Sequence, residues 1–245
     1  ERQAAIGEFS AFLATEIREP LGSIRAQLEE VTAEGILDFD PQTRVENAMR
    51  DLIRIAAPLN ETLDFARPLA LTRRLCRGPE MVENALTVVA TELEATRIQV
   101  VKEYAGLLAP VRADEAKMQQ VFLSIFKNAI EAMTPGGILT ISMSNQRAGR
   151  HLEVQILIKN NGAPIPPEHV DKVFEPFFTT KRSGTGLGLA TVKKIVEEHQ
   201  GSIGISGTPG EGTTVTIRLP GVSRGPAHRY RGRGRRPPRR PTAAS

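Results

Sequence analysis

Alternating apolar and polar side chains in the second half of the chain constrain the fold more than any other feature. The alternation covers residues 139–144 and 154–158. A period of two places one face of a strand against a core and the other face toward solvent. Shorter alternating runs at 203–205 and 215–219 look like a closing hairpin. The sequence therefore predicts a sheet with one buried face.

Segments with helical signals are interspersed with these strands. We expect a strand at 98–104 and helices at 80–96, 115–133 and 189–200, the last ending at Gly201. Strands and helices follow one another without a regular strand–helix–strand repeat. The fold class is therefore α+β, with an α/β sandwich over residues 75–220.

Residues 1–69 are expected to form a separate helical hairpin. Apolar residues recur every three or four positions from Ile6 to Val31, interrupted by Pro20, and a heptad seam follows from Val45 to Leu63. A hairpin of two helices cannot bury both apolar stripes, whereas two copies can bury them in a four-helix bundle. The pattern predicts a homodimer.

Cysteine and apolar content exclude several classes of protein. The single cysteine, Cys76, excludes an internal disulfide and a cysteine-based metal cluster. No apolar stretch approaches the ~18 residues of a membrane helix, and no signal-peptide pattern opens the chain. Because the chain begins with Glu1 rather than Met, we expect it to be the C-terminal part of a longer protein. We expect it in the cytoplasm, alone or as the cytoplasmic part of a membrane-bound sensor.

The last segment, residues 221–245, differs in composition from the rest. It contains eight arginines and no acidic residue, which exceeds the whole chain's net charge of +4, so the body is mildly acidic. So few apolar residues predict disorder. Nucleic acid or anionic lipid could bind such a charge through counterion release. With Tyr230 as the one stacking side chain, we favour a solvated extension instead.

A glycine-rich run directly precedes the helix expected at 189–200. It consists of Gly184, Thr185, Gly186, Leu187 and Gly188. Glycines allow backbone N–H groups to approach phosphate oxygens, and the helix N-terminus adds its partial positive charge. Just upstream, Phe178, Thr180 and Lys181 supply an aromatic hinge, a hydroxyl group and a cation near the same phosphates.

A polar pair on the helix expected at 115–133 completes the candidate site. Lys127 and Asn128 lie in the segment KNAIEA. The amide oxygen of Asn128 is a hard ligand suited to Mg²⁺. Taken with the glycine-rich run, it makes nucleotide binding the favoured interpretation over a helix-surface amide.

Four segments in this order carry a family resemblance: QQVFLSIFKNAIEAM, IKNNGAPIP, VFEPFFTTK and GTGLGLATVKKIVEEHQG. They resemble the N, G1, F and G2 boxes of sensor histidine kinases, whose ATPase domain is shared with gyrase-type and chaperone-type ATPases. FLATEIREPLGSI resembles the H-box helix of the dimerisation and phosphotransfer domain. The resemblance implies ATP with Mg²⁺, a homodimer and a response-regulator partner. It also assigns Asn160 and Gly162 of the G1 box to the nucleotide site.

The H-box departs from the family at its acceptor. Glu16 and Pro20 match, but Thr15 stands at the histidine position and Glu19 at the Asn/Thr position. A hydroxyl group needs strong activation, whereas a neutral imidazole is nucleophilic near pH 7. We therefore expect no autophosphorylation on this chain. The four histidines lie outside the hairpin and are expected on the surface or in the tail: His151, His169, His199 and His228.

The G1 box departs from the family at the base-binding position. Asn160 replaces an Asp that accepts a hydrogen bond from the adenine amino group, and Pro164 replaces a glycine. A neutral amide still accepts through its oxygen, with a loss of about 1 kcal/mol, somewhat under tenfold in affinity. In the N box, Ser124 stands where the family often has Asn. ATP binding is expected to be weakened, not abolished.

Three functions remain open at this point. The first is a histidine-kinase core that binds ATP and phosphorylates a histidine on a partner, as a homodimer or a heterodimer with another histidine kinase. The second is an inactive pseudokinase that dimerises and binds a response regulator. The third is a Ser/Thr protein kinase, which would not need the front hairpin.

Overall fold

The computed structural model describes residues 68–149, 151–181 and 184–222, together with positions 22–24, 26, 46, 49, 50 and 65. Nearly all of the predicted hairpin, including Thr15 and Glu16, lies outside the described residues, as does the tail beyond Val222. Within the described segments, no helix is both long and apolar enough to cross a membrane.

A five-stranded sheet forms one layer of the domain, in the order β2-β4-β5-β7-β6. Its strands are β2 (Gln99–Tyr104), β4 (Ile138–Ala148), β5 (His151–Asn160), β6 (Ser202–Thr208) and β7 (Gly212–Pro220). β2 runs parallel to β4, and the other neighbouring pairs are antiparallel. The hairpin predicted from the last two alternating runs is confirmed as β6 and β7.

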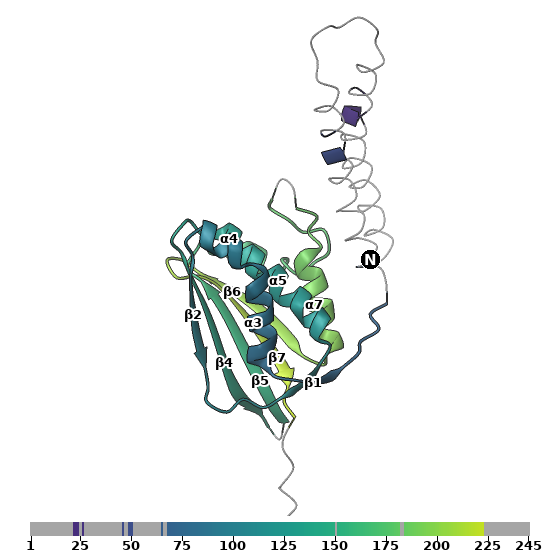
Figure 1. Cartoon of the computed structure of the whole chain (residues 1–245), viewed down its shortest axis with the longest axis vertical. Coiled ribbons are helices and arrows are strands. Elements are labelled where there is room, and N and C mark those ends of the chain that lie inside the picture. Colours follow the sequence, from purple (N-terminus) through teal and green to yellow (C-terminus); the bar gives the residue numbers. More distant parts are fainter. Residues whose placement is uncertain are drawn as a thin grey trace, which may run out of the picture.

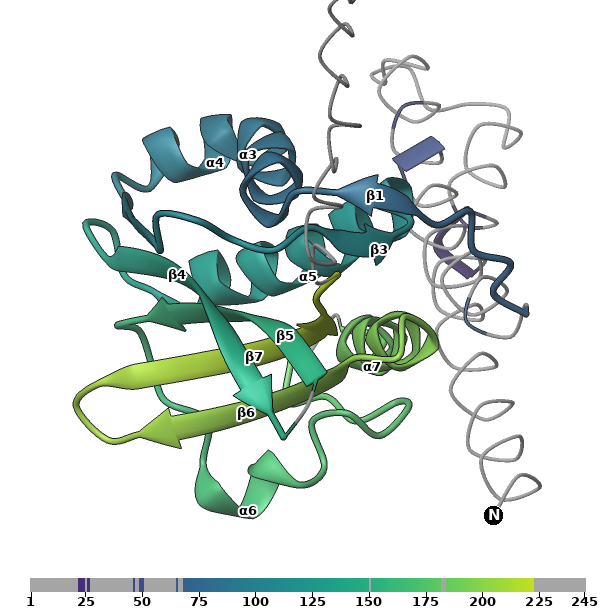
Figure 2. The ribbon, with the colours of Figure 1, turned by 90° about the horizontal axis from the view of Figure 1, so that it is seen from below.

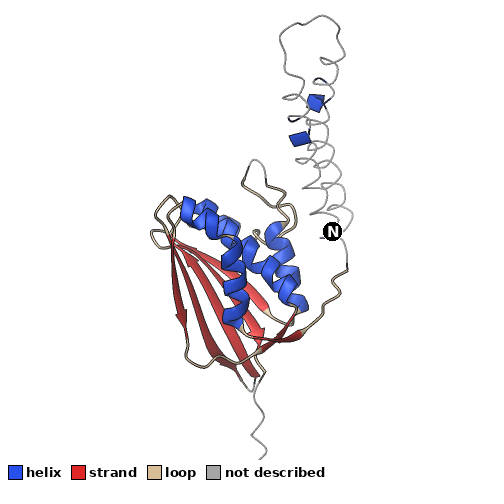
Figure 3. Cartoon of the chain, viewed as in Figure 1, coloured by secondary structure: helices blue, strands red, loops and turns tan. Residues whose placement is uncertain are grey.

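Helices cover one face of this sheet (Figures 1 and 3). They are α3 (Gly78–Val88), α4 (Ala90–Ala95), α5 (Glu115–Ala132) and α7 (Gly188–Glu198). α5 packs against both α3 and α7, and Figure 2 shows all three on the same side of the strands. The predicted α/β sandwich is confirmed.

The core lies between these two layers. Apolar side chains of α5, including the stacked rings of Phe122 and Phe126, face the buried rows of the strands. The buried apolar residues of β4, β5 and β7 are those that the alternation predicted: Leu139, Ile141, Met143, Val154, Ile156, Ile158, Val215, Ile217 and Leu219. The buried faces of β4, β5 and β7 thus fix which side of the sheet the helices cover.

Some elements differ from those predicted. The helix expected at 80–96 is broken at Val89, which has ψ near 8° and separates α3 from α4. The β-branched run Thr87–Val89 has low helix propensity, which accounts for a break at this place. The short helix α6 (Pro167–Val170) was not predicted.

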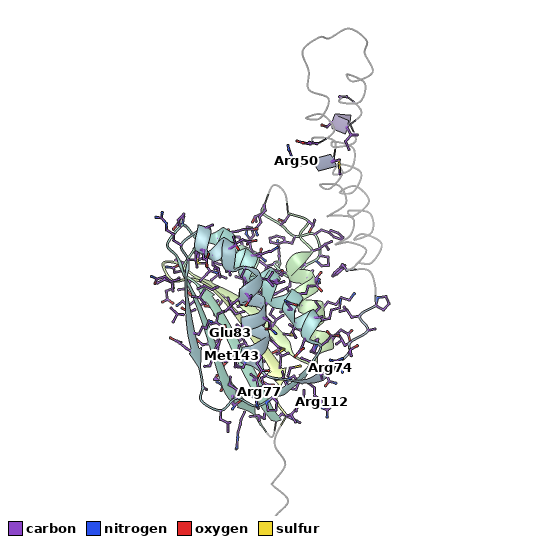
Figure 4. All side chains as sticks on the ribbon, viewed as in Figure 1. Arg50, Arg74, Arg77, Glu83, Arg112 and Met143 are labelled. Carbon is purple, nitrogen blue, oxygen red and sulfur yellow. The ribbon has the colours of Figure 1, made fainter. Side chains whose placement is uncertain are left out.

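A small second sheet joins the start of the domain to the segment before α5. β1 (Arg74–Cys76) pairs antiparallel with β3 (Val111–Ala113). Figure 4 places Arg74, Arg77 and Arg112 at this end of the domain. Arg74, one residue before the predicted start at 75, thus takes part in this strand pairing.

The first two residues of the predicted tail, Gly221 and Val222, are among the described residues. Gly221 N–H donates to the Leu152 carbonyl at 2.8 Å, and Val222 N–H donates to the Pro110 carbonyl at 2.7 Å. These two residues of the predicted tail are therefore hydrogen-bonded to the domain.

His199 is buried, at 3% exposure, so its predicted surface position is wrong. Its Nδ1 lies 2.7 Å from the Ile195 carbonyl, and its Nε2 accepts the Asp114 N–H at 2.9 Å. Because a carbonyl oxygen only accepts, the hydrogen belongs on Nδ1. The ring thus ties the end of α7 to the start of α5. His151 is exposed as predicted, whereas His169 is half-buried, with its ring 5.3 Å from that of Phe178.

Asp114 caps the N-terminus of α5 and anchors the chain before β1. Its carboxylate accepts from Lys117 N–H at 3.1 Å and from Thr72 N–H at 2.8 Å. Burial raises the pKa of this carboxyl group, but the bonds from backbone N–H groups outweigh burial and hold its pKa below the ordinary value of 3.8. A lowered folded-state pKa contributes stability above the unfolded-state pKa, and that stability is lost as the pH falls below it.

We expect Asp114→Ala to lower the free energy of unfolding by about 1–2 kcal/mol at pH 7, the range for loss of a helix cap. The difference from the unchanged chain should shrink as the pH falls below 3.8 toward the lower pKa of folded Asp114, because the carboxyl group of the unfolded chain then takes up a proton first. Urea denaturation followed by circular dichroism at pH 7 and pH 3.5 measures both. Asp171→Ala removes an exposed carboxylate and serves as the control. An equal loss of unfolding free energy at pH 7 and pH 3.5 would contradict a stabilising role for the Asp114 charge.

Candidate functional site

α5 presents its predicted polar residues beside its buried apolar face. Ile125, Phe126, Ala129 and Ile130 are buried, and this anchoring leaves Asn128 half-buried and Lys127 exposed. The spacing follows from the helical repeat of 3.6 residues. Within the described part of the chain, no hydrogen bond or ion pair joins Lys127 to the other predicted residues.

The ammonium group of Lys181 contacts Asn128 Oδ1, the oxygen atom that is predicted to bind a metal ion. Lys181 Nζ donates to Asn128 Oδ1 at 2.7 Å and also pairs with the Glu131 carboxylate. The oxygens of these two side chains thus already converge on one positive charge. Such a donor set also suits Mg²⁺, which prefers carboxylate and amide oxygens.

The glycine-rich run folds back onto the segment before it. Phe177 N–H donates to the Gly186 carbonyl at 3.1 Å, and both residues have φ near +69°. A Cβ on Gly186 would lie 2.3 Å from the carbonyl carbon of Phe177. Only glycine therefore fits this crossing, and residues 177–181 and 184–186 form what we call the lid. Residues 182 and 183 lie outside the described part.

The end of the lid leads directly into α7. Leu187 is buried and anchors the turn, and Thr185 Oγ1 accepts the Leu187 N–H at 3.3 Å. Among the described residues, no side chain caps this helix N-terminus, and its first turn contains no acidic residue. The partial positive charge of the helix start is therefore not offset by a carboxylate of this turn, which favours an anion. Phe178 is half-buried, whereas Thr180 is exposed.

The loop after β5 lies against the C-terminal end of α5. Ala163 N–H donates to the Ala132 carbonyl at 3.0 Å, and a Cβ on Gly162 would lie 2.3 Å from that same oxygen. Asn160, at 5% exposure, accepts the Gly162 N–H through Oδ1 at 3.0 Å. The oxygen expected to serve a base is thus engaged within the loop.

These segments all contact one side of α5. Gly188 approaches Ser124, Lys181 pairs with Asn128, and Gly162 abuts Ala132. Because Ser124, Asn128 and Ala132 are spaced by four residues, they lie on one helix face. We call this face and its partners the α5 site.

Two residues of this region were not predicted as site residues. Glu131 belongs to the segment that pointed to Asn128, and its i+3 spacing could have identified it. Thr213 is buried at 6% exposure, and its hydroxyl group donates to the Ala163 carbonyl at 3.3 Å. Its place at the start of an otherwise apolar alternating run was the available signal.

Comparison with known proteins agrees with this arrangement. Residues 113–223 match the family described as histidine kinase-, DNA gyrase B-, and HSP90-like ATPase. The sensor histidine kinase ZraS of Escherichia coli K12 is 30% identical over 220 residues, which cover 90% of this chain and 46% of ZraS. The signal transduction histidine-protein kinase AtoS of the same strain is 33% identical over 220 residues, which cover 90% of this chain and 36% of AtoS. The chain carries the ATPase core of a sensor histidine kinase.

Solved structures of relatives share the fold of this histidine-kinase core. The nucleotide-free catalytic domain of histidine kinase ThkA aligns with a TM-score of 0.56 and 29% identity, covering 62% of this chain and 97% of that domain. ThkA in complex with the response regulator TrrA aligns with a TM-score of 0.71 and 25% identity over 91% of this chain and 64% of ThkA. The histidine-kinase core spans less than half the length of ZraS and AtoS.

Proposed function

We propose that the α5 site binds ATP with Mg²⁺, and that the chain is the ATP-binding core of a two-component sensor histidine kinase. The observation that carries this proposal is the Lys181 ammonium on Asn128 Oδ1, beside the lid and the uncapped start of α7. A divalent cation would bind Asn128 Oδ1, and phosphate oxygens would bind Lys181 and the start of α7.

Each part of the site has a chemical role in this proposal. Mg²⁺, when bound, neutralises phosphate charge, and Asn128 Oδ1 is the side-chain oxygen that would hold it. Lys181 would leave Asn128 and pair with phosphate oxygens. Backbone N–H groups of residues 184–188 would donate to the remaining phosphate oxygens.

The phosphoryl acceptor is proposed to lie on another chain. Thr15 and Glu16 belong to the predicted hairpin of residues 1–69, and a threonine hydroxyl group is a poor acceptor without a base. We propose that this core pairs with a second copy or with another histidine kinase, and that a histidine of the partner receives the phosphoryl group. A response regulator, in the cytoplasm, is the proposed downstream partner. Labelling candidate partners with radioactive ATP tests this, because phosphohistidine is acid-labile and phosphoserine is not.

Nucleotide binding itself is tested through Asn128. We expect Asn128→Ala to weaken binding of Mg²⁺–nucleotide by at least about tenfold, because a metal ligand is lost. Calorimetric titration of the whole chain with Mg²⁺–ATP measures the affinity. Gln120→Ala removes an exposed amide from the same helix and should leave affinity unchanged. Equal affinities of the Asn128→Ala and unchanged chains would rule out Asn128 as the metal ligand.

A further inference from the structure

A lysine in the second half of α7 contacts the predicted hairpin. Lys194 Nζ donates to the Phe65 carbonyl at 2.6 Å, and the same ammonium group lies 5.2 Å from the centre of the Phe65 ring. Phe65 belongs to the predicted hairpin of residues 1–69 and is itself helical. A charged hydrogen bond and a cation–π contact thus join one side chain of α7 to one residue that precedes the domain.

The Phe65 carbonyl is available to Lys194 because neither residue that could serve it along the chain does so. In a helix this carbonyl would accept from the N–H of residue 69, or of residue 68 in a tighter turn. Leu69 lies outside any helix, and Pro68 has no N–H. A cation is also favoured there, because a helix has a partial negative charge at its C-terminal end. Lys194 therefore acts as a cap for this carbonyl.

The C-terminal end of α7 is capped in the reverse direction. The Arg73 guanidinium group, just before β1, donates to the Glu198 carbonyl. α7 ends at Glu198, and no backbone N–H group of the described residues bonds this carbonyl outside the helix. Each side thus supplies the cation that caps a carbonyl of the other. We call these two bonds, Lys194 to Phe65 and Arg73 to Glu198, the clasp.

The domain side of the clasp is firmly held. Thr72 N–H donates to the Asp114 carboxylate at 2.8 Å, and Asp114 N–H donates to His199 Nε2 at 2.9 Å. The segment that enters β1 is therefore tied to the start of α5 and to the end of α7. The bond from Lys194 to Phe65 carries this attachment back to the predicted hairpin.

The groups of the clasp suit a contact that opens and closes. Lys194 is half-buried and Arg73 is exposed, so water can replace either partner. One hydrogen bond from a charged group changes such an equilibrium by about ten- to a hundredfold. The closed arrangement is then favoured without being permanent. Motion between linked parts is also the default where few groups join them.

We propose that the clasp is an autoinhibitory latch between the ATP-binding domain and the predicted hairpin. Closed, it holds the α5 site at a fixed place relative to Phe65. Open, it frees the domain to move about residues 68–71, which belong to no helix or strand, and to carry bound ATP toward an acceptor. The inhibitory effect rests on the proposed function, because it needs ATP at the α5 site, whereas the clasp itself does not.

Pulsed electron paramagnetic resonance on the whole chain measures whether the domain is held. Glu46→Cys and Glu94→Cys place nitroxide labels on the predicted hairpin and on α4, where both positions are exposed. The native Cys76 is buried and stays unlabelled. Dilution with an excess of unlabelled chain restricts the measured distance to one molecule.

The variants remove the clasp from either side. We expect Lys194→Ala and Arg73→Ala each to raise the fraction of molecules outside the main distance peak by about tenfold. Lys159→Ala removes an exposed lysine that pairs with Glu211, and should keep the distribution of the unchanged chain. The same distribution in all four chains would show that the clasp does not hold the domain.

The inhibitory role is tested by adding an acceptor to the chain. With Thr15→His and radioactive ATP, the introduced imidazole nitrogen attacks the γ-phosphorus. The bond from that phosphorus to the ADP oxygen breaks, ADP leaves with the electron pair, and the imidazole proton passes to water. Acid-labile label should appear about tenfold faster when Lys194→Ala or Arg73→Ala is added, but not when Lys159→Ala is added. Open distances without faster labelling would overturn the inhibitory role.

Calorimetric titration with Mg²⁺–ATP distinguishes this failure from failure of the proposed function. Lys194 lies six residues, about 9 Å along the helix axis, beyond Gly188 at the lid end of α7. Lys194→Ala and Arg73→Ala should therefore bind ATP as the unchanged chain does. Weaker binding in these variants alone would place their effect in the site and overturn the latch. Absence of ATP binding in every chain would remove the proposed function, and the inhibitory role with it, while the distances would still decide whether the clasp holds the domain.

Discussion

Replacing Gly212 by alanine is expected to lower the free energy of unfolding by about 3 kcal/mol, the largest stability effect that the structure predicts for a single methyl group. Gly212 opens β7 with φ near +94°, and a Cβ there would lie 2.0 Å from the Asn160 carbonyl oxygen. Two costs therefore add. An L-residue with positive φ is strained by roughly 1–2 kcal/mol, and the strand pair β5–β7 must also separate to relieve the clash.

Gly210 provides a matched control in the same hairpin. Its φ is near +81°, but a Cβ there would have nothing within 4 Å. Gly210→Ala should therefore cost only the conformational strain, roughly 1–2 kcal/mol. Urea denaturation of the whole chain, followed by circular dichroism, compares the two. If both substitutions lowered stability equally, the close approach of β7 to Asn160 would not be what constrains residue 212.

The strands and α5 could be predicted because their signals are local. Residues 139–144 alternate over six positions and residues 154–158 over five, which is long enough to distinguish a period of two from a helical period. β1 and β3 have three residues each, too few for any period, and they exist because two distant segments pair. No local pattern contains that information.

The surface position predicted for His199 was wrong for a different reason. It follows Val192, Ile195 and Val196 on the apolar face of α7, so its position indicated burial. Expecting it on the surface gave more weight to residue type than to position. A buried histidine is stable here because the Ile195 carbonyl and the Asp114 N–H match both ring nitrogens.

The candidate site could be predicted in its components but not in its bonding. The glycine-rich run and Asn128 were named from the sequence, and the structure gathers them along α5. That Lys181 pairs with Asn128, and that Gly162 engages the Asn160 oxygen, depends on loops whose paths no periodicity encodes. The second contact engages the Asn160 oxygen that was expected to accept a hydrogen bond from the base. Domain boundaries and the dimer are still predictions.

Replacing Gly186 by alanine is expected to weaken Mg²⁺–nucleotide binding by about a hundredfold or more, and to lower the stability of the domain by at least the roughly 1–2 kcal/mol that a positive φ costs an L-residue. The new Cβ would lie 2.3 Å from the Phe177 carbonyl carbon, at a φ of +69°. The lid must then open, and N–H groups of residues 184–188 move away from the phosphates. Hydrogen bonds to charged groups are worth about 1.5–3 kcal/mol each, so losing two accounts for the loss.

The control Gly136→Ala distinguishes the effect of a changed lid on nucleotide affinity from the effect of backbone strain on stability. Gly136 has φ near +85° and open space around a Cβ, and it precedes β4, outside the lid. The Gly136→Ala substitution should lower the free energy of unfolding by roughly 1–2 kcal/mol and leave nucleotide affinity unchanged. Calorimetric titration with Mg²⁺–ATP, together with urea denaturation, gives both quantities for each variant. Full affinity in Gly186→Ala would mean that the lid adjusts around Phe177, and the phosphates would then depend on α7 and Lys181 alone.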